Sequence, residues 1–225
     1  MINYTLTKII PGVFHVKCKS PYDLAMLFVR AQEYYECPNP EIKGQYFKMN
    51  DFIEWYSAKN DMNEFTYPVD WCGFNIPDYA VRQAIDGAFK IGDSNEYDHT
   101  MLEIIKSCEL SNMKFYLVGT MEVEFRKINI RSTIAHELAH ALYYLDSEYR
   151  QTMLELNLKI KEQLTPNLLN YGYHEEVVDD EIQAYMISGL SQLILDQENE
   201  LYNYAINYQN VFQLKLEGLL KQHNT

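Results

Sequence analysis

The residues with the clearest potential for chemistry lie in the segment RSTIAHELAHALYYLDSEYR, residues 131–150, which contains an HExxH pattern. Residues four apart on an α-helix project from the same face, so His136 and His140 could bind one metal ion together. Glu137 would lie beside them, close enough to accept a proton from a water molecule that the metal activates. Such a group of side chains could hydrolyse a carbonyl compound, for example a peptide bond.

Five residues can match this pattern by chance, so the alternative is an ordinary helix with two histidines. The flanking residues favour a metal site, because Ile134, Leu138 and Leu142 make the segment apolar and helix-forming. A pair of histidines buried beside a glutamate costs free energy unless a partner compensates it. We therefore expect a metal ion here, and the third ligand decides the class of site.

One candidate for the third ligand is Asp146, ten residues after His136. The metzincin pattern, HExxHxxGxxH or the same pattern with a final Asp, places its third ligand at that distance. Its glycine turns the chain back towards the metal, but Tyr143 stands at that position here. On an unbroken helix Asp146 would lie away from the histidine face, so we do not expect a metzincin site.

The second candidate is Glu181, in the segment VVDDEIQAYMISG at residues 177–189, with Ala184 three positions later. With these residues the chain resembles the gluzincin metallopeptidases, the thermolysin-like class. In that class HExxH is followed by a helix with the pattern Glu-x-x-(Ala/Ser)-(Asp/Asn). The resemblance implies a zincin-like fold and one Zn²⁺ per chain, held by His136, His140 and Glu181.

The resemblance also implies roles for other residues. Glu137 would be the general base and then the general acid of peptide-bond hydrolysis. Tyr173 and His174 precede the Glu181 helix and are candidates to donate hydrogen bonds to the transition-state oxyanion. The chain departs from the pattern at Tyr185, where the class has a carboxylate or amide that orients a histidine. Either of the preceding aspartates, Asp179 and Asp180, could take that orienting role.

A third possibility belongs to a different class of protein. Glu137 and His140 form an ExxH pair, and Glu96 and His99 form another. Paired ExxH motifs with two further glutamates build di-iron sites in four-helix bundles. Those bundles need a helix with a glutamate between the two motifs, whereas residues 114–125 indicate a strand here. A zincin-like protein that binds metal without cleaving anything, and a metal-free helical interaction protein, also remain open.

The pattern of apolar residues and caps predicts a mainly α-helical α+β protein. A strand is expected at residues 114–125, KFYLVGTMEVEF. In gluzincins the strand before the HExxH helix is an edge strand that pairs with extended substrate, so the resemblance implies that Gly119 and its neighbours line a cleft. A structured loop is expected at residues 65–77. Helices are expected at residues 20–36, 50–60, 78–89 and 96–108, and around HELAH. A long amphipathic helix through Ile160 is expected next, then a short turn of helix from Thr165, and helices at 175–195 and 199–222.

The 225 residues are expected to form a single domain. Residues 1–110 carry no motif that we can assign, and residues 111–225 hold the strand, the HExxH helix, the helix with Glu181 and a C-terminal helix. The helix at residues 20–36 has clear signals, with Ser20 as the cap and Pro21 at the first position. Asn50 is expected to cap the next helix.

Composition narrows the choice of partners and compartment. The formal net charge is -13, from 32 acidic and 19 basic residues, which argues against nucleic acid or an anionic membrane surface as a partner. No apolar run reaches the ~20 residues of a membrane-spanning helix. The four cysteines show no CxxC spacing and the N-terminus lacks a signal-peptide pattern, so we expect a cytoplasmic protein with reduced, buried cysteines. The expected partner is a protein or peptide substrate.

Overall fold

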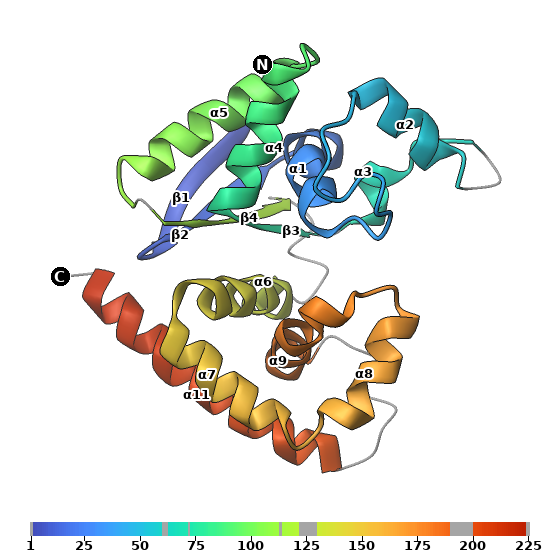
Figure 1. The fold of residues 1–225 in the computed structure, drawn as a ribbon. Coiled ribbons are helices and arrows are strands. Elements are labelled where there is room, and N and C mark those ends of the chain that lie inside the picture. Colours follow the sequence, from blue (N-terminus) through green and yellow to red (C-terminus); the bar gives the residue numbers. More distant parts are fainter. Residues whose placement is uncertain are drawn as a thin grey trace. The chain divides into compact units, whose positions relative to one another are not determined.

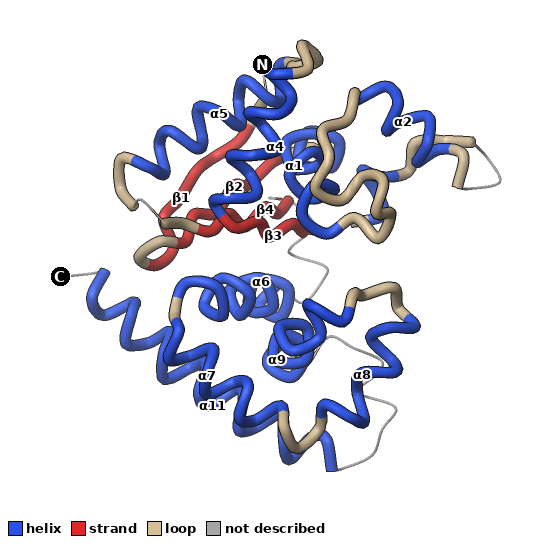
Figure 2. Tube along the Cα trace, viewed as in Figure 1, coloured by secondary structure: helices blue, strands red, loops and turns tan. Residues whose placement is uncertain are grey.

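A computed structural model describes residues 2–59, 63–71, 73–112, 114–121, 130–189 and 200–223 (Figures 1 and 2). The chain forms two compact units, one made of residues 1–8 and 14–124 and the other of residues 9–13 and 125–225. Each unit is described by itself below. The single-domain organisation expected from the sequence stays a prediction.

The first unit contains a four-stranded sheet with the order β1-β2-β4-β3, except for the residues of β1 and β2 that fall within 9–13. Strands β3 and β4 are antiparallel, with Phe74 opposite Gly119. The expectation that the strand before the HExxH segment is an edge strand is wrong, because β4 lies between β2 and β3 and both of its sides are paired. The strands are β1 (Tyr4–Ile10), β2 (Val13–Cys18), β3 (Gly73–Pro77) and β4 (Tyr116–Met121).

Gly119 takes part in packing between the sheet and a helix and is not placed to bind a substrate. A Cβ atom added at Gly119 would collide with the aromatic ring of Phe28, which lies on the first helix. The glycine therefore lets that ring approach the sheet closely. The prediction that Gly119 lines a substrate cleft is corrected accordingly, and residues 122–125 of the predicted strand lie outside the described residues.

In the first unit α1 and α4 lie on one side of the sheet, where α1 contacts β3 and β4 and α4 contacts β3 (Figure 1). Ser20 caps α1 as predicted, since its side chain accepts a hydrogen bond from the Asp23 amide. Asn50 does not cap α2; the helix begins at Met49, whose amide donates to Asp93 Oδ2 at 2.7 Å. The helices are α1 (Pro21–Glu36), α2 (Met49–Ser57), α3 (Tyr67–Asp70), α4 (Asp78–Lys90) and α5 (Glu96–Glu109).

Two segments of the first unit differ from the sequence-based expectation. Residues 65–77 are not a loop throughout, since they contain α3 and β3. Residues 4–18 form the hairpin β1–β2, to which the sequence analysis assigned no element. The alternation of partly buried and exposed residues in YTLT and the positive φ of Gly12, 82°, are the signals that mark this hairpin.

The second unit is helical and has α9 at its centre, because α9 contacts α6, α7, α8 and α11. Gly189, with a φ of 64°, ends α9 in the left-handed conformation that favours glycine. Residues 190–195 of the predicted helix lie outside the described residues. The elements are α6 (Ile130–Leu145), α7 (Ser147–Asn157), α8 (Lys161–Asn170), the short 3₁₀ helix η2 (Glu175–Val177), α9 (Val178–Ser188) and α11 (Glu200–His223).

The long amphipathic helix predicted after HELAH is α7, which ends at Asn157, before the predicted Ile160. Asp146 caps α7 by accepting hydrogen bonds from the amides of Glu148 and Tyr149. Ile160 lies between α7 and α8 and belongs to neither helix. Thr165 does not begin a helix, because α8 starts at Lys161 and runs through Pro166.

The fold class predicted from the sequence is confirmed, since helices dominate and one small sheet accompanies them. Among the described residues, no helix combines the length and the apolar character needed to cross a membrane. Cys18, Cys37 and Cys108 are buried free thiols, and burial raises the pKa of each to about 12. Cys72 lies outside the described residues.

Candidate metal centre

The site forms where α6 and α9 pack against each other. Leu138, Ala139 and Leu142 of α6 are buried, as the apolar pattern around HELAH predicted. On α9 the small side chain of Ala184 is fully buried, and its backbone carbonyl accepts a hydrogen bond from the His136 ring. These apolar contacts fix two helices side by side, and the polar residues of both helices then face each other.

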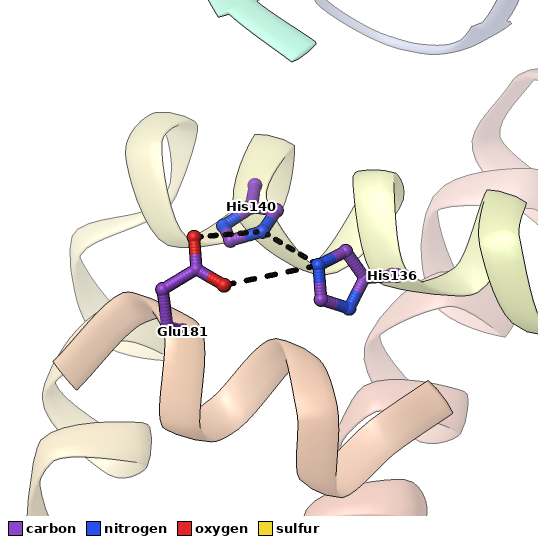
Figure 3. A group of neighbouring side chains, drawn as sticks. All are labelled: His136, His140 and Glu181. Carbon is purple, nitrogen blue, oxygen red and sulfur yellow. Dashed lines mark hydrogen bonds and ion pairs between the residues drawn. The ribbon is translucent and has the colours of Figure 1, made fainter. Parts of the chain in front are cut away.

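The structure brings together the three side chains that the sequence selected as metal ligands (Figure 3). His136 and His140 lie one turn apart on α6, and Glu181 faces them from the first turn of α9. One ligand atom from each residue lies within 4.8 Å of the others. The Glu181 carboxylate oxygens lie 3.9 Å from His136 Nε2 and 3.8 Å from His140 Nε2.

The geometry of the two imidazoles fits a shared cation. Their Nε2 atoms are 3.2 Å apart. Two nitrogens bound to one tetrahedral zinc at about 2.0–2.1 Å would be separated by roughly 3.4 Å. Two bare lone pairs facing each other at this distance would repel, so a proton or a metal ion belongs between them. Two imidazoles and one carboxylate are also a ligand set that catalytic zinc uses, and the residues therefore fit this ion.

Of the two candidate aspartates, Asp180 is the one that contacts a histidine, and it orients His140. His140 Nδ1 donates to Asp180 Oδ1 at 2.9 Å, which leaves Nε2 directed towards His136 and Glu181. Burial lowers the pKa of His140, but the carboxylates of Asp180 and Glu181 outweigh it and hold this pKa well above its ordinary value. Asp179 instead binds Asn157 and Lys161.

His136 has the opposite environment, which keeps its ring neutral. Burial, together with the nearby positive charge of His140, lowers the pKa of His136 to about 3, against the effect of the hydrogen bond to Ala184. Its Nδ1 lies 3.3 Å from Ser188 Oγ. The ring of Tyr185 stands edge-on to the His136 ring, with centroids 4.8 Å apart. A neutral imidazole with an available Nε2 is the form that binds a metal.

Glu137 lies beside this group and is 7% exposed. Its carboxylate is near enough to raise the pKa values of His140 and Tyr185 by its charge. Such a position, next to the ligands but on a different face of the helix, suits a carboxylate that accepts a proton from a water molecule in the site.

Of the two predicted oxyanion donors, the structure brings Tyr173 to the site and does not bring His174. The Tyr173 hydroxyl is 2.6 Å from the Tyr185 hydroxyl, and Tyr185 contacts His136. The His174 side chain is exposed, and its backbone carbonyl accepts from Val177 at the start of η2. Tyr185 departs from the gluzincin pattern but faces the site, and its position four residues after Glu181 on the same helix is the sequence signal for this.

The residues of the alternative sites have other contacts. Asp146 accepts from Lys215 Nζ at 2.5 Å in addition to capping α7. Glu96 and His99 lie on α5 in the first unit, where the His99 ring packs edge-on to Phe89. Within the described part of the chain, the group of three or more His, Cys, Asp or Glu side chains that could hold a metal contains none of these residues.

Comparison of the chain with protein-family models, with curated proteins and with solved structures finds no match. The functional assignment therefore rests on the chemistry and geometry of the residues in this site, together with the short resemblance to the gluzincin pattern.

Proposed function

We propose that this protein is a zinc-dependent metallopeptidase that hydrolyses peptide bonds of a protein or peptide substrate. The observation that carries the proposal is the convergence of His136 Nε2, His140 Nε2 and the Glu181 carboxylate within 4.8 Å, with Glu137 beside them. The order of the motifs along the chain, HExxH and then Glu-x-x-Ala, supports the same assignment.

Each residue has a defined task in this proposal. His136, His140 and Glu181 would hold the zinc ion. Bound zinc would supply Lewis acidity and would lower the pKa of a water molecule towards neutrality. Glu137 would accept a proton from the water molecule that attacks the substrate carbonyl, and would then deliver that proton to the leaving amine. The Tyr173–Tyr185 pair offers a hydroxyl donor next to His136 for the developing oxyanion.

Replacing Glu137 by Gln tests this assignment directly. The amide keeps the size of the side chain but cannot take up the proton, so we expect zinc content and thermal stability like the wild type. Hydrolysis should fall by at least ~10²-fold, the usual contribution of a general base. Zinc is measured by mass spectrometry and cleavage by mass analysis of a peptide library and of unfolded protein substrates.

A matched control is Glu175→Gln, which makes the same chemical change at an exposed residue of η2. This control should retain full turnover. Undiminished cleavage by the Glu137→Gln protein would contradict the proposed mechanism. A wild-type protein that binds zinc but cleaves no substrate would instead indicate a zincin-like protein that only binds metal.

A further inference from the structure

A chain of hydrogen bonds connects His140 to residues far from the ligands. The Tyr149 hydroxyl on α7 donates to Gln183 Oε1 at 3.0 Å. Gln183 Nε2 on α9 donates to Asp180 Oδ1 at 2.8 Å. The same oxygen, Asp180 Oδ1, accepts from His140 Nδ1 on α6 at 2.9 Å. Three helices of the second unit are thereby joined through side chains that end at one candidate ligand.

The chemistry of the groups determines which atom donates in each of these hydrogen bonds. An ionised carboxylate only accepts, so Asp180 requires the amide nitrogen of Gln183 and a protonated Nδ1 of His140. The amide oxygen of Gln183 then faces the other way and also only accepts, so Tyr149 must donate its hydroxyl proton. Burial and the charge of Asp180 raise the pKa of Tyr149, which keeps that proton in place.

The outer residues of this chain of hydrogen bonds are more deeply buried than Asp180. Gln183 is 0% exposed and Tyr149 is 3% exposed, whereas the Asp180 side chain is 22% exposed. A partly exposed aspartate can rotate towards water unless another group holds it. Gln183 is the second donor to Asp180 Oδ1 and is itself held by Tyr149, so the two buried residues restrict the carboxylate to the orientation that faces His140.

We propose that Gln183 and Tyr149 are positioning residues of the metal centre, which hold Asp180 so that His140 keeps its proton on Nδ1 and presents Nε2 to the metal. The inference rests on the metal site of the proposed function, although it does not depend on which bond is hydrolysed. Residues that orient a metal-bound histidine contribute 10–100-fold to metal affinity in known sites. Gln183 and Tyr149 act one and two hydrogen bonds further out than Asp180.

A second buried chain in the same unit provides a matched control. The Tyr208 hydroxyl on α11 donates to Asn157 Oδ1 at 2.9 Å, and Asn157 Nδ2 donates to Asp179 Oδ1 at 3.0 Å. Tyr208 is 0% exposed. This chain also runs from a buried tyrosine through an amide to an aspartate of α9, but the hydrogen bonds of that aspartate lead to Asn157 and Lys161, away from His140.

The test compares Tyr149→Phe, Gln183→Met and Tyr208→Phe in the full chain. Zinc affinity is measured by competition with a chelator, and thermal unfolding shows how much stability each variant has lost. In zinc-loaded protein, NMR follows the solvent exchange of the proton on His140 Nδ1. We expect Gln183→Met to weaken zinc binding about tenfold and Tyr149→Phe about threefold. Both should speed exchange of the Nδ1 proton, while Tyr208→Phe loses comparable stability and changes neither quantity.

Equal effects of Tyr149→Phe and Tyr208→Phe on zinc affinity and on proton exchange would overturn the inference, because both changes would then act only through stability. If Gln183→Met unfolds, Tyr149→Phe and Tyr208→Phe still decide the question. Zinc binding by the wild type without hydrolysis would contradict the proposed peptidase and leave this inference standing. A wild type that binds no zinc would contradict both.

Discussion

His136 and His140 carry the same side chain on the same face of α6, yet their surroundings give them different properties. His140 faces the carboxylates of Asp180 and Glu181, which favour its protonated form. His136 faces an alanine carbonyl, a serine hydroxyl and a tyrosine ring, and burial keeps it neutral. Without a metal, one proton can lie between the two Nε2 atoms, 3.2 Å apart. A metal ion that takes this place releases that proton.

The first prediction at the residue scale concerns Asp180. Asp180→Asn keeps an acceptor for His140 Nδ1 but removes the charge that strengthens this hydrogen bond. Zinc affinity should fall by about tenfold, as measured by chelator competition. Asp179→Asn is the control, because Asp179 binds Asn157 and Lys161, and it should lower stability while leaving zinc affinity intact. A larger loss of zinc affinity in Asp179→Asn than in Asp180→Asn would contradict the roles assigned to the two aspartates.

The second prediction at this scale concerns His15 in the first unit. Burial, with a smaller effect of Lys17, lowers the pKa of His15 to about 4 from 6.5, and its Nε2 lies 2.5 Å from Thr120 Oγ1. The folded protein therefore resists protonation more than the unfolded chain does. Above pH 6.5 His15 is neutral in both states and costs the folded protein no stability. As the pH falls from 6.5 towards 4, the unfolded chain binds the proton first, so the free energy of unfolding decreases.

By pH 5 this loss should amount to about 2 kcal/mol. His15→Gln, which cannot take up a proton, should remove that part of the pH dependence. Urea unfolding of both proteins at pH 7 and pH 5 measures the difference. Parallel losses of stability in the wild type and in His15→Gln would show that His15 does not cause the acid sensitivity.

At the scale of the elements, local sequence signals predicted most helices correctly. The wrong boundaries and the missed strand depend on contacts between residues far apart in the sequence. Ser20 and Pro21 begin α1 as expected, since a cap needs only its neighbours. The start of α2 depends on Asp93, 44 residues away in the sequence, so Asn50 gave the wrong boundary. Residues 73–77 form a strand because they pair with β4, and no local pattern encodes that partner.

The grouping of the three candidate ligands was more predictable than the sheet. An i, i+4 histidine pair follows from helix geometry, and Glu181 followed from its place in the second motif. The sequence left Asp180 as one of two aspartates that could orient a histidine. It gave no signal for Gln183 and Tyr149, because a series of buried hydrogen bonds between helices has no fixed spacing in a sequence. Tyr185 was noticed only as a mismatch, although its ring contacts His136.

One prediction belongs to the contact between α6 and α9. Ala184 is fully buried there, so Ala184→Leu should push the helices apart and destabilise the protein by about 1–3 kcal/mol. Zinc affinity should fall as well, because Glu181 moves away from the histidines. Ala205→Leu on α11, where Ala205 is 5% exposed, is the control that overpacks another helix. Chelator competition should show weaker zinc binding only for Ala184→Leu, and normal affinity in that variant would contradict this account.

At the scale of the whole molecule, the candidate metal ligands and most of the sheet belong to different units. Apart from residues 9–13, the sheet and its helices lie in the first unit, while all three candidate ligands, Glu137 and the hydrogen-bonded residues behind them lie in the second. The formal net charge of -13 and the acidic residues Asp179, Asp180 and Glu181 at the start of α9 suit a cation more than an anionic ligand. A cytoplasmic location stays a prediction.

The central claim is that His136, His140 and Glu181 hold one zinc ion. The most direct test is the metal content of the wild type and of Glu181→Ala, purified side by side and measured by mass spectrometry. We predict one zinc per chain in the wild type, and weakened or lost binding in the variant, which lacks one of three ligands. Two irons per chain in the wild type, or no metal after zinc has been supplied, would contradict the account.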